Sequence, residues 1–386
     1  MDLPFRFGKY ELLERIATGG MAEVFLARSF GVEGFEKRLV IKRILPALAN
    51  NPRFVSMFIE EAKISVGLVH PNIVQIFELG RVGEDHYMAM EYIHGRDLTR
   101  VNRQARSLDR SIPVPLAVYV ASCVLRGLSY AHRLRDSGGE HISLVHRDVS
   151  PHNILVTFHG EVKLVDFGIA RLAGAQQGCR EGPGGGKYAY MSPEQALGRE
   201  LDGRSDIYST GIVLWEMLVG RRLFRHEDPA ERLRMVCEAE VPDPRSEVAG
   251  LSDRLWQVLQ KMLALNPGDR HLRADLAEEE LRAVLFEEGC RVGPLDVASF
   301  LRELVDLGEE PAALGLDVRG LARDLARLDA SSLGSEGSAS GSTQPGEGQL
   351  PGITTDHTPA VADQGEHKPV AVLVAEVCGL TSLSRT

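Results

Sequence analysis

The feature that most constrains the fold of this chain is a pair of acidic motifs on either side of a predicted β-hairpin. Residues 146–153 read His-Arg-Asp-Val-Ser-Pro-His-Asn and residues 166–168 read Asp-Phe-Gly, so the two aspartates are eighteen positions apart. Between them, residues 154–158 and 161–165 are short β-type runs around a His-Gly turn. Because a hairpin folds back on itself, both motifs are expected at the same end of it.

The oxygen-bearing side chains in these motifs indicate transfer of a phosphoryl group. Asp148 is placed to accept the proton of a substrate hydroxyl. Asn153 and Asp166 supply hard oxygen ligands for a magnesium ion that bridges the phosphates of a nucleotide, with manganese as the alternative metal. Residues 191–194, Met-Ser-Pro-Glu, close the segment. Motifs in this order and at these spacings rarely arise by chance.

Two further signals lie upstream. Residues 16–24 read Ile-Ala-Thr-Gly-Gly-Met-Ala-Glu-Val, and small residues in such a turn let backbone amides approach phosphate oxygens. Taken alone, this motif fits a glycine-rich turn with no ligand equally well. Lys42 lies in an expected strand, and Glu61 follows nineteen residues later in an expected helix. Such a pair can hold an ammonium at the phosphates, although a solvated surface pair is the commoner arrangement.

The surrounding pattern predicts an α+β chain with two unequal lobes. Residues from about 8 to 92 combine short β-type runs with one helical stretch at 54–69, whereas helical periodicity dominates from about 96 to 289. Accessory helices are expected within 290–330, where they could pack on the larger lobe or on a partner. Residues 331–366 are rich in small and polar residues, and we expect them to form a disordered linker.

Taken together, these motifs make the chain resemble the bacterial members of the eukaryotic-like (Hanks-type) serine/threonine protein kinase family over about residues 8–289. The resemblance implies a two-lobed protein kinase fold with ATP in the cleft between the lobes. It also implies a gatekeeper at Met90, a hinge at 91–93 and an acidic residue, Asp97, at the ribose. The residues expected around the nucleotide are Ile16, Ala17, Thr18, Gly19, Gly20, Met21, Ala22, Val24, Val40, Lys42, Met90, Glu91, Ile93, Asp97 and Leu155.

Three more residues match structural positions of that family. Asp206 resembles a buried carboxylate that supports the catalytic loop, and Glu194 with Arg270 resembles a buried ion pair. An inactive relative could keep all three, so they indicate the fold and say little about turnover.

The catalytic loop departs from the family at Ser150, where most serine/threonine kinases have a lysine that meets the transferred phosphoryl group. Lys187 occupies a position where the family normally has a threonine. Our hypothesis is that Ser150 and Lys187 exchange these roles, so that the ammonium approaches the transferring group from the opposite side. A solvated loop lysine is the alternative.

A second departure concerns control. Residues 167–190 contain no Ser or Thr, so the usual phosphorylation switch in this loop is not expected to operate. We expect the loop to be ordered constitutively or by a partner. Self-phosphorylation is more plausible in the tail, although a passive linker remains the alternative there. The candidate tail sites are Ser332, Ser335, Thr354, Thr355 and Thr358.

The composition of the chain limits which classes of partner we expect it to bind. With 44 basic against 54 acidic residues the formal net charge is −10, which disfavours nucleic acid as a partner. The 5 cysteines are scattered without metal-ligand spacing, which favours free thiols and a cytoplasmic location. The sequence shows neither a signal-peptide pattern nor a run of about 18 apolar residues, so no membrane span is expected.

The last segment, residues 367–386, reads as a single strand. Residues 372–381 weakly resemble the opening strand of a class III nucleotide cyclase domain, with Glu376 and Leu380 in place of the family's Asp and Phe. The chain could be a truncated kinase–cyclase fusion, or the strand could match by chance. The sequence as a whole predicts a magnesium-dependent kinase that transfers the γ-phosphoryl group of ATP to Ser or Thr hydroxyls of proteins. The alternative is a nucleotide-binding pseudokinase scaffold.

Overall fold

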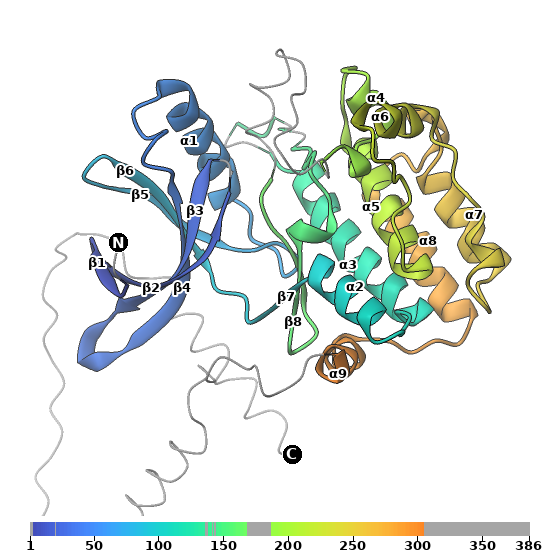
Figure 1. Cartoon of the computed structure of the whole chain (residues 1–386), viewed down its shortest axis with the longest axis horizontal. Helices are drawn as coiled ribbons and strands as arrows, with labels where there is room; N and C mark the ends of the chain where they lie inside the picture. The colour runs from blue at the N-terminus through green and yellow to red at the C-terminus, as the bar shows by residue number, and fades with distance from the viewer. Residues whose placement is uncertain are drawn as a thin grey trace, which may run out of the picture. The chain divides into compact units, whose positions relative to one another are not determined.

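The computed structural model describes residues 3–19, 21–135, 138–140, 142, 144–167 and 187–304 (Figure 1). They form a smaller lobe built on a β-sheet and a larger helical lobe, as the sequence predicts. The sheet of the smaller lobe is antiparallel throughout. In spatial order its strands are β1 (Phe5–Phe7), β2 (Tyr10–Thr18), β3 (Ala22–Phe30), β4 (Glu36–Ile44), β6 (Asp85–Glu91) and β5 (Ile76–Val82).

Strand alternation gives this sheet two different faces. Along β4, Leu39 and Ile41 belong to an apolar cluster on one face, whereas Ile44 belongs to a second cluster with Phe58 of α1 (Pro52–Val66). Because side chains two apart share a face, Lys42 lies on the same side as Ile44, toward α1. The period of the strand therefore sets the direction of the lysine toward the helix.

Helix α1 begins where the sequence provides a cap. The side chain of Asn51 accepts a hydrogen bond from the backbone N–H of Arg53, and Pro52 occupies the first turn, where a missing N–H costs nothing. The helix starts two residues before the predicted stretch for this reason. It presents Glu61 and Ala62 to the lobe interior.

The larger lobe is built around α3 (Val114–His132) and α5 (Gly203–Val219), whose side chains are mostly buried. Within the described residues, α3 alone has the length and apolarity of a membrane span, but 72% of its most apolar stretch is buried as in a core helix. The helices of this lobe are α2 (Leu98–Ser107), α3 (Val114–His132), α4 (Pro193–Ala196), α5 (Gly203–Val219), α6 (Pro229–Glu238), α7 (Asp253–Met262), α8 (Ala274–Glu287) and α9 (Pro294–Leu304). Of the short 3₁₀ turns, η1 (Val32–Gly34) lies in the smaller lobe, between β3 and β4. The others lie in the larger lobe and are η2 (Pro151–Asn153), η4 (Lys187–Tyr190), η5 (Pro244–Ser246) and η6 (Pro267–Asp269).

A three-stranded sheet lies where the two lobes meet. Its order is β7 (Gly95–Asp97), β8 (Ile154–Thr157) and β9 (Val162–Leu164), and β8 with β9 is the hairpin predicted between the acidic motifs. The turn has Gly160 at φ +84°, a left-handed conformation that glycine adopts without strain. Leu164 also forms a parallel bridge with Ile73, which precedes β5, so the hairpin is tied to both lobes.

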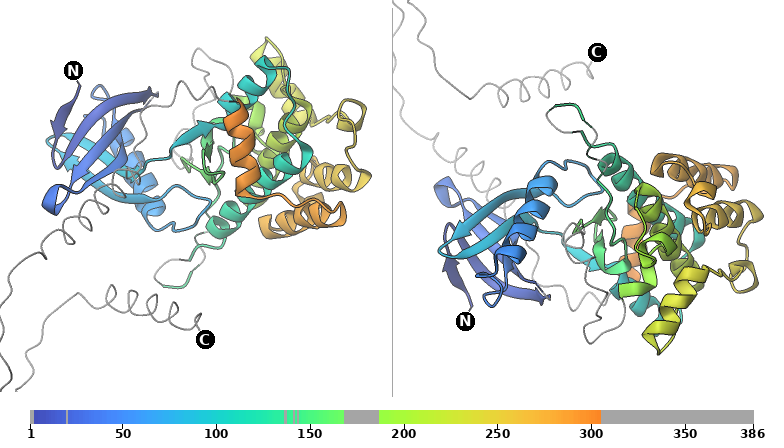
Figure 2. Two further views of the ribbon diagram at one scale, coloured as in Figure 1. Left: turned by 90° about the horizontal axis from the view of Figure 1, so that it is seen from below. Right: turned by 90° about the horizontal axis from the view of Figure 1, so that it is seen from above.

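The first of the expected accessory helices is α9. Its buried side chains join the apolar core of the larger lobe, and Figures 1 and 2 show it beside α2 and the β8–β9 hairpin. The expected helix at 318–328, the linker at 331–366 and the strand at 367–386 lie outside the described residues.

Candidate active site

Lys42 is the centre of a three-residue ionic cluster. Its Nζ lies 2.9 Å from Oε1 of Glu61 on α1 and 2.9 Å from Oδ1 of Asp166, which follows β9. The side chains of Lys42 and Glu61 are 15% and 11% exposed, whereas that of Asp166 is half exposed. The predicted Lys42–Glu61 pair is therefore formed, and it joins the sheet, the helix and the second acidic motif.

Burial and charge act against each other in this cluster. Burial alone would lower the pKa of Lys42, but the carboxylates of Asp166 and Glu61 raise it above its ordinary value. Burial would raise the pKa of Asp166, and the Lys42 ammonium lowers it instead. For Glu61 burial prevails and the pKa is raised. The lysine is thus held as a cation and Asp166 as a carboxylate, the form that binds metal ions.

The first acidic motif is shaped by hydrogen bonds between its own members. The amide nitrogen of Asn153 donates to the backbone oxygen of Asp148 at 2.9 Å and to its Oδ2 at 3.2 Å. Arg147 and Asp166 have φ values of +67° and +56°, in the left-handed region that non-glycine residues rarely occupy. The hairpin brings both motifs to one end, as predicted from sequence.

Asp206, at the start of α5, supports the catalytic loop, residues 146–153. The residue is 1% exposed, and its carboxylate accepts the backbone N–H groups of His146 and Arg147, each at 2.8 Å. The Nε2 of His132 lies 2.7 Å away from Oδ2. Burial raises the pKa of Asp206, but the hydrogen bond and charge of His132 bring it below the ordinary value. Asp206 is therefore a buried carboxylate that supports this loop, as the resemblance implied.

The imidazole of His146 links the two motifs. Its Nδ1 accepts the backbone N–H of Asp148 at 3.2 Å, so its Nε2 is the atom that donates to the backbone oxygen of Val165 at 3.0 Å. Burial lowers the pKa of His146, which favours this neutral form. The ring also contacts Phe167, with centroids 4.6 Å apart. The residue before Asp166 and the residue after it are thereby fixed relative to Asp148.

The predicted nucleotide-contacting residues lie on adjacent strands. The register pairs Ala17 with Val24, Val24 with Lys42, and Val40 with Met90, so these side chains follow each other across β2, β3, β4 and β6. The N–H of Gly19 donates to the oxygen of Ala22 at 2.8 Å and closes the turn, whereas Gly20 lies outside the described residues. The remaining members on these strands are Ile16 and Thr18 on β2 and Glu91 on β6, with Met21 just before β3 and Ile93 after β6.

On the other side of the cleft, Asp97 pairs with Leu155 between β7 and β8. Asp97 is also the N-cap of α2, where its side chain accepts the backbone N–H of Arg100 at 3.0 Å. A small pocket is lined by Met90, Glu61, Asp166 and Phe167, among others.

Comparison with known proteins agrees with this geometry. A family model described as "Protein kinase domain" matches residues 10–281. The chain belongs to the protein kinase family. Proteins of this family generally use ATP and a divalent metal ion.

Among curated proteins, "Tyrosine-protein kinase MasK" of Myxococcus xanthus is 38% identical over 335 residues, covering 87% of this chain and 52% of the relative. "Serine/threonine-protein kinase PrkC" of Bacillus subtilis is 30% identical over 275 residues, covering 71% and 40%. This chain thus spans about half the length, or less, of these relatives. The PknI kinase domain of Mycobacterium tuberculosis matches with a TM-score of 0.55 at 25% identity, covering 75% of this chain and 99% of that structure.

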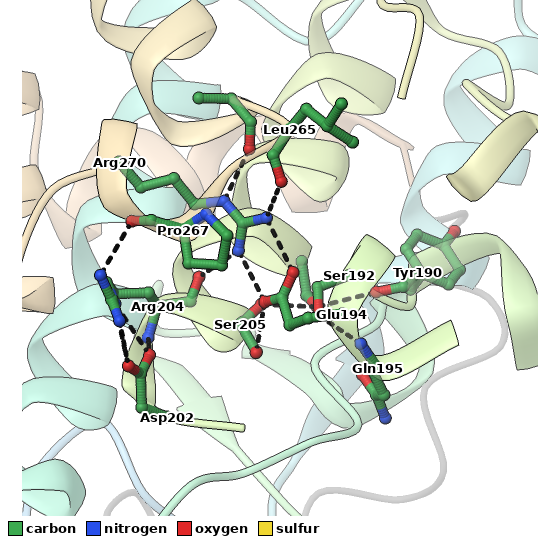
Figure 3. A network of polar contacts seen from close by, with 12 residues as sticks. Tyr190, Ser192, Glu194, Gln195, Asp202, Arg204, Ser205, Leu265, Pro267 and Arg270 are labelled. Atoms are coloured by element: carbon green, nitrogen blue, oxygen red, sulfur yellow. Dashed lines mark hydrogen bonds and ion pairs between the residues drawn. The ribbon is translucent and has the colours of Figure 1, made fainter. Parts of the chain in front are cut away.

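The predicted pair between Glu194 and Arg270 forms a buried bidentate ion pair in this kinase domain (Figure 3). The two guanidinium nitrogens lie 2.7 and 2.9 Å from the two carboxylate oxygens. Arg270 also donates to the backbone oxygens of Ala264 and Leu265, and Ser205 donates to Glu194. Because the guanidinium of Arg270 donates to acceptors on several sides, its buried charge is fully compensated.

Tyr190, next to the closing motif, is packed rather than presented to solvent. Its hydroxyl donates to Glu216 at 2.6 Å and accepts from Arg222, whose guanidinium stacks on the ring. Ser150 is 8% exposed at the start of η2. Lys187 begins η4, but its side chain and residues 168–186 lie outside the described part of the chain.

Two ion pairs near the site were not predicted from sequence. Lys163 on β9 pairs with Glu91, an expected hinge residue, at 2.9 Å. Arg43 has a 3% exposed side chain and binds Glu23, just after the glycine-rich turn, at 2.8 Å. In both cases a charged residue lies within an otherwise apolar strand. Such a residue needs a partner when the strand is buried, and this is the signal from which an ion pair could have been predicted. The sequence does not reveal which partner.

Proposed function

We propose that this chain is a magnesium-dependent protein kinase that transfers the γ-phosphoryl group of ATP to Ser or Thr hydroxyls. The observation that carries the proposal is the Lys42 cluster, in which one ammonium contacts both Glu61 and Asp166 at 2.9 Å. In this arrangement the lysine is fixed by α1 while Asp166 remains ionised and half exposed. A scaffold that binds no nucleotide has no need to keep this largely buried ammonium between two carboxylates.

The reaction assigns Asp148 to the acceptor. The substrate hydroxyl oxygen bonds to the γ-phosphorus as the bond from that phosphorus to the β–γ bridging oxygen breaks, and ADP leaves. The hydroxyl proton passes to the carboxylate of Asp148, whose position is set by Asn153. Lys42 holds the phosphates of ATP, and Glu61 orients the lysine.

A magnesium ion would be held by Asn153 and Asp166. The amide nitrogen of Asn153 is engaged with Asp148, which assigns its amide oxygen to a metal, and Asp166 contributes a carboxylate. Within the described residues no group of three or more His, Cys, Asp and Glu side chains could hold a metal ion alone. Two protein ligands fit an ion that completes its shell with phosphate oxygens and water, and whose charge offsets that of the transferring group.

Ser150 and Lys187 are proposed as the exchanged pair at the transferring phosphoryl group. The buried hydroxyl of Ser150 lies two residues from Asp148, and Lys187 supplies the cation that the family usually has at position 150. Replacing Lys187 by Met is expected to cut turnover severely while leaving ATP affinity roughly intact. Normal turnover in that variant would contradict the exchange.

The type of acceptor hydroxyl is a separate question. The motif at 190–194 favours Ser and Thr, and the relative from Bacillus subtilis is named a serine/threonine-protein kinase. Tyrosine is the second candidate, because the relative that is 38% identical is named a tyrosine-protein kinase and because Ser150 replaces the usual lysine. Analysis of phosphorylated residues after reaction with a mixed protein substrate separates the two.

Control is proposed to act without phosphorylation of Ser or Thr between Asp166 and Met191, because the sequence has none there. The tail residues Ser332, Ser335, Thr354, Thr355 and Thr358 are the proposed sites of self-phosphorylation, and they lie outside the described residues. Mapping phosphosites after incubation with ATP tests both statements. Stoichiometric phosphate on Tyr188 or Tyr190 would show that phosphorylation controls this loop after all, and a tail that carries no phosphate would contradict the proposed sites.

The deciding experiment compares the wild type with Asp148→Asn. Intact mass and transfer to a generic protein substrate are measured with magnesium and ATP. Transfer by the wild type alone is the expected result and supports the proposed function. Absence of transfer by the wild type, with ATP still raising the melting temperature, would favour a pseudokinase scaffold instead.

A further inference from the structure

Helix α9 lies beyond the part of the chain that matches the protein kinase family, yet it is built into the larger lobe. The family match ends at residue 281, and α9 begins at Pro294. Leu301 is 1% exposed and Leu304 is 2% exposed, and both belong to the same apolar core as the α2 residues Leu98 and Val101. The helix is therefore a packed part of the lobe.

The start of α9 meets the turn of the β8–β9 hairpin in close backbone contact. A Cβ atom added to Gly160 would lie 1.7 Å from the carbonyl oxygen of Pro294, a separation that no side chain tolerates. Gly160 has φ +84°. Only glycine permits both this turn conformation and this approach, so the position of the hairpin turn and the start of α9 are fixed together.

The far end of α9 is fastened to the segment after α2. Arg110 forms an ion pair with Glu303 at 2.7 Å, and its guanidinium lies over the ring of Phe300 with a distance of 5.5 Å to the centroid. Arg110 is thus engaged by α9 on two sides. Figure 1 shows α9 below α2 and close to the lower end of β8.

Both elements that α9 supports carry proposed nucleotide contacts. Asp97, at the proposed ribose position, is the last residue of β7 and the N-cap of α2. Leu155, another residue expected around the nucleotide, lies on β8 and pairs directly with Asp97. A displacement of α2 or of the hairpin therefore moves one of these two residues relative to the smaller lobe.

We propose that α9 holds α2 and the β8–β9 hairpin in the geometry that binds ATP, so that a segment outside the matched kinase domain sets the nucleotide affinity of the cleft. The ligand in this inference comes from the proposed function. The α9 residues act as positioning residues, since Leu301 and Glu303 act through α2 and the hairpin. The chain after residue 304 is then connected, through α9, to the site of phosphoryl transfer.

The test compares two leucines of α9 in the full chain. Leu301→Asp places a carboxylate in the core and is expected to release the helix, whereas Leu295→Asp changes a side chain that is 79% exposed on the same helix. The dissociation constant of magnesium-ATP is measured by calorimetry, well below both melting temperatures. We expect Leu301→Asp to raise it roughly tenfold and Leu295→Asp to leave it within about twofold.

A second pair of variants avoids a buried charge. Gly160→Ala forces the start of α9 away, whereas Gly83→Ala introduces the same left-handed strain in the β5–β6 turn, at φ +59° with open space around the added Cβ. We expect weaker ATP binding in Gly160→Ala only. The KM for ATP should rise with a much smaller change in kcat, which general loss of stability would not produce.

Hydrogen exchange over residues 294–304 shows whether each variant has released α9. If α9 is released in Leu301→Asp or Gly160→Ala and ATP binds as tightly as in the wild type, the inference is wrong while the proposed function stands. A wild-type chain that binds no ATP would refute the proposed function and, with it, the role of α9 at the nucleotide.

Discussion

Lys163 on β9 and Glu91 at the end of β6 form an ion pair, with Nζ and Oε1 2.9 Å apart, that joins the two lobes beside the hinge. Their side chains are 11% and 28% exposed, so the pair is largely shielded from solvent. The backbone N–H of Gln75 also donates to Glu91 at 3.3 Å. One carboxylate therefore binds both the chain before β5 and the hairpin of the larger lobe.

Replacing Lys163 by Met is expected to loosen this connection. Glu91 would be left partly buried with one backbone N–H for a partner, so the free energy of unfolding should fall by about 1–3 kcal/mol. The angle between the lobes would be less restricted, and we expect the KM for ATP to rise about threefold with a smaller effect on kcat. Denaturant unfolding and steady-state kinetics measure the two effects.

A matched control for Lys163 lies in the larger lobe. Lys261 on α7 forms a pair with Glu280 at 2.7 Å, but its side chain is 43% exposed and far along the chain from the hinge. Lys261→Met should cost at most about 1 kcal/mol and leave the KM for ATP unchanged. Equal effects of the two substitutions on that KM would show that the hinge pair has no special role.

Lys42→Met is expected to abolish most of the activity without unfolding the protein. The substitution removes the cation that contacts Glu61 and Asp166, and loss of one such preorganised charge lowers turnover by about 10²–10³-fold. Lys37→Met on the same strand removes a lysine whose ammonium lies over the ring of Phe77, and should be close to wild type. Phosphate transfer with magnesium-ATP is the measurement, and activity above a tenth of wild type in Lys42→Met would contradict the assigned role.

Glu194→Gln tests the buried pair shown in Figure 3. The substitution leaves the charge of Arg270 buried with neutral partners, and we expect a loss of about 3–5 kcal/mol in the free energy of unfolding. Glu247→Gln removes an exposed partner of Arg221, and should cost about 1 kcal/mol or less. Urea unfolding of both variants decides the matter, since similar losses would mean that burial adds nothing to the Glu194 pair.

The sequence was sufficient for features that depend on neighbours along the chain. The hairpin between the acidic motifs follows from two β-type runs and a His-Gly turn, and its fold-back explains why the motifs that carry Asp148 and Asp166 lie at the same end of it. Strand alternation likewise determines that Lys42 lies on the face toward α1. These relations are local, so the residue pattern specifies them.

Contacts between segments that are far apart in the chain could not be predicted from the sequence. Residues Glu91 and Lys163 are 72 positions apart, and Arg110 and Glu303 are 193 apart, so their pairing depends on how whole elements pack. For α9 the amphipathic pattern indicated a helix with an apolar face and left its partner open. The contact of Pro294 with Gly160 answers that question through backbone geometry, which no side-chain pattern records.

The stability of the protein should fall as the pH is lowered below about 6.5, and His271 should contribute to this dependence. The residue is 1% exposed, and burial lowers its pKa, assisted by the charges of Lys261 and Arg254 and opposed by Glu280, whose Oε2 lies 3.3 Å from Nε2. Below the ordinary histidine pKa the unfolded chain therefore binds a proton that the folded chain does not, so stability rises with pH in that window and levels off above it.

His271→Gln removes this titrating group while keeping a polar side chain of similar reach. Between pH 5 and 6.5 the slope of the unfolding free energy against pH should decrease, by at most about 1.4 kcal/mol per pH unit for one proton. His226→Gln is the control, because that histidine is exposed. Urea unfolding at a series of pH values gives the slopes, and an unchanged slope in His271→Gln would show that the buried imidazole takes up its proton without opposing the fold.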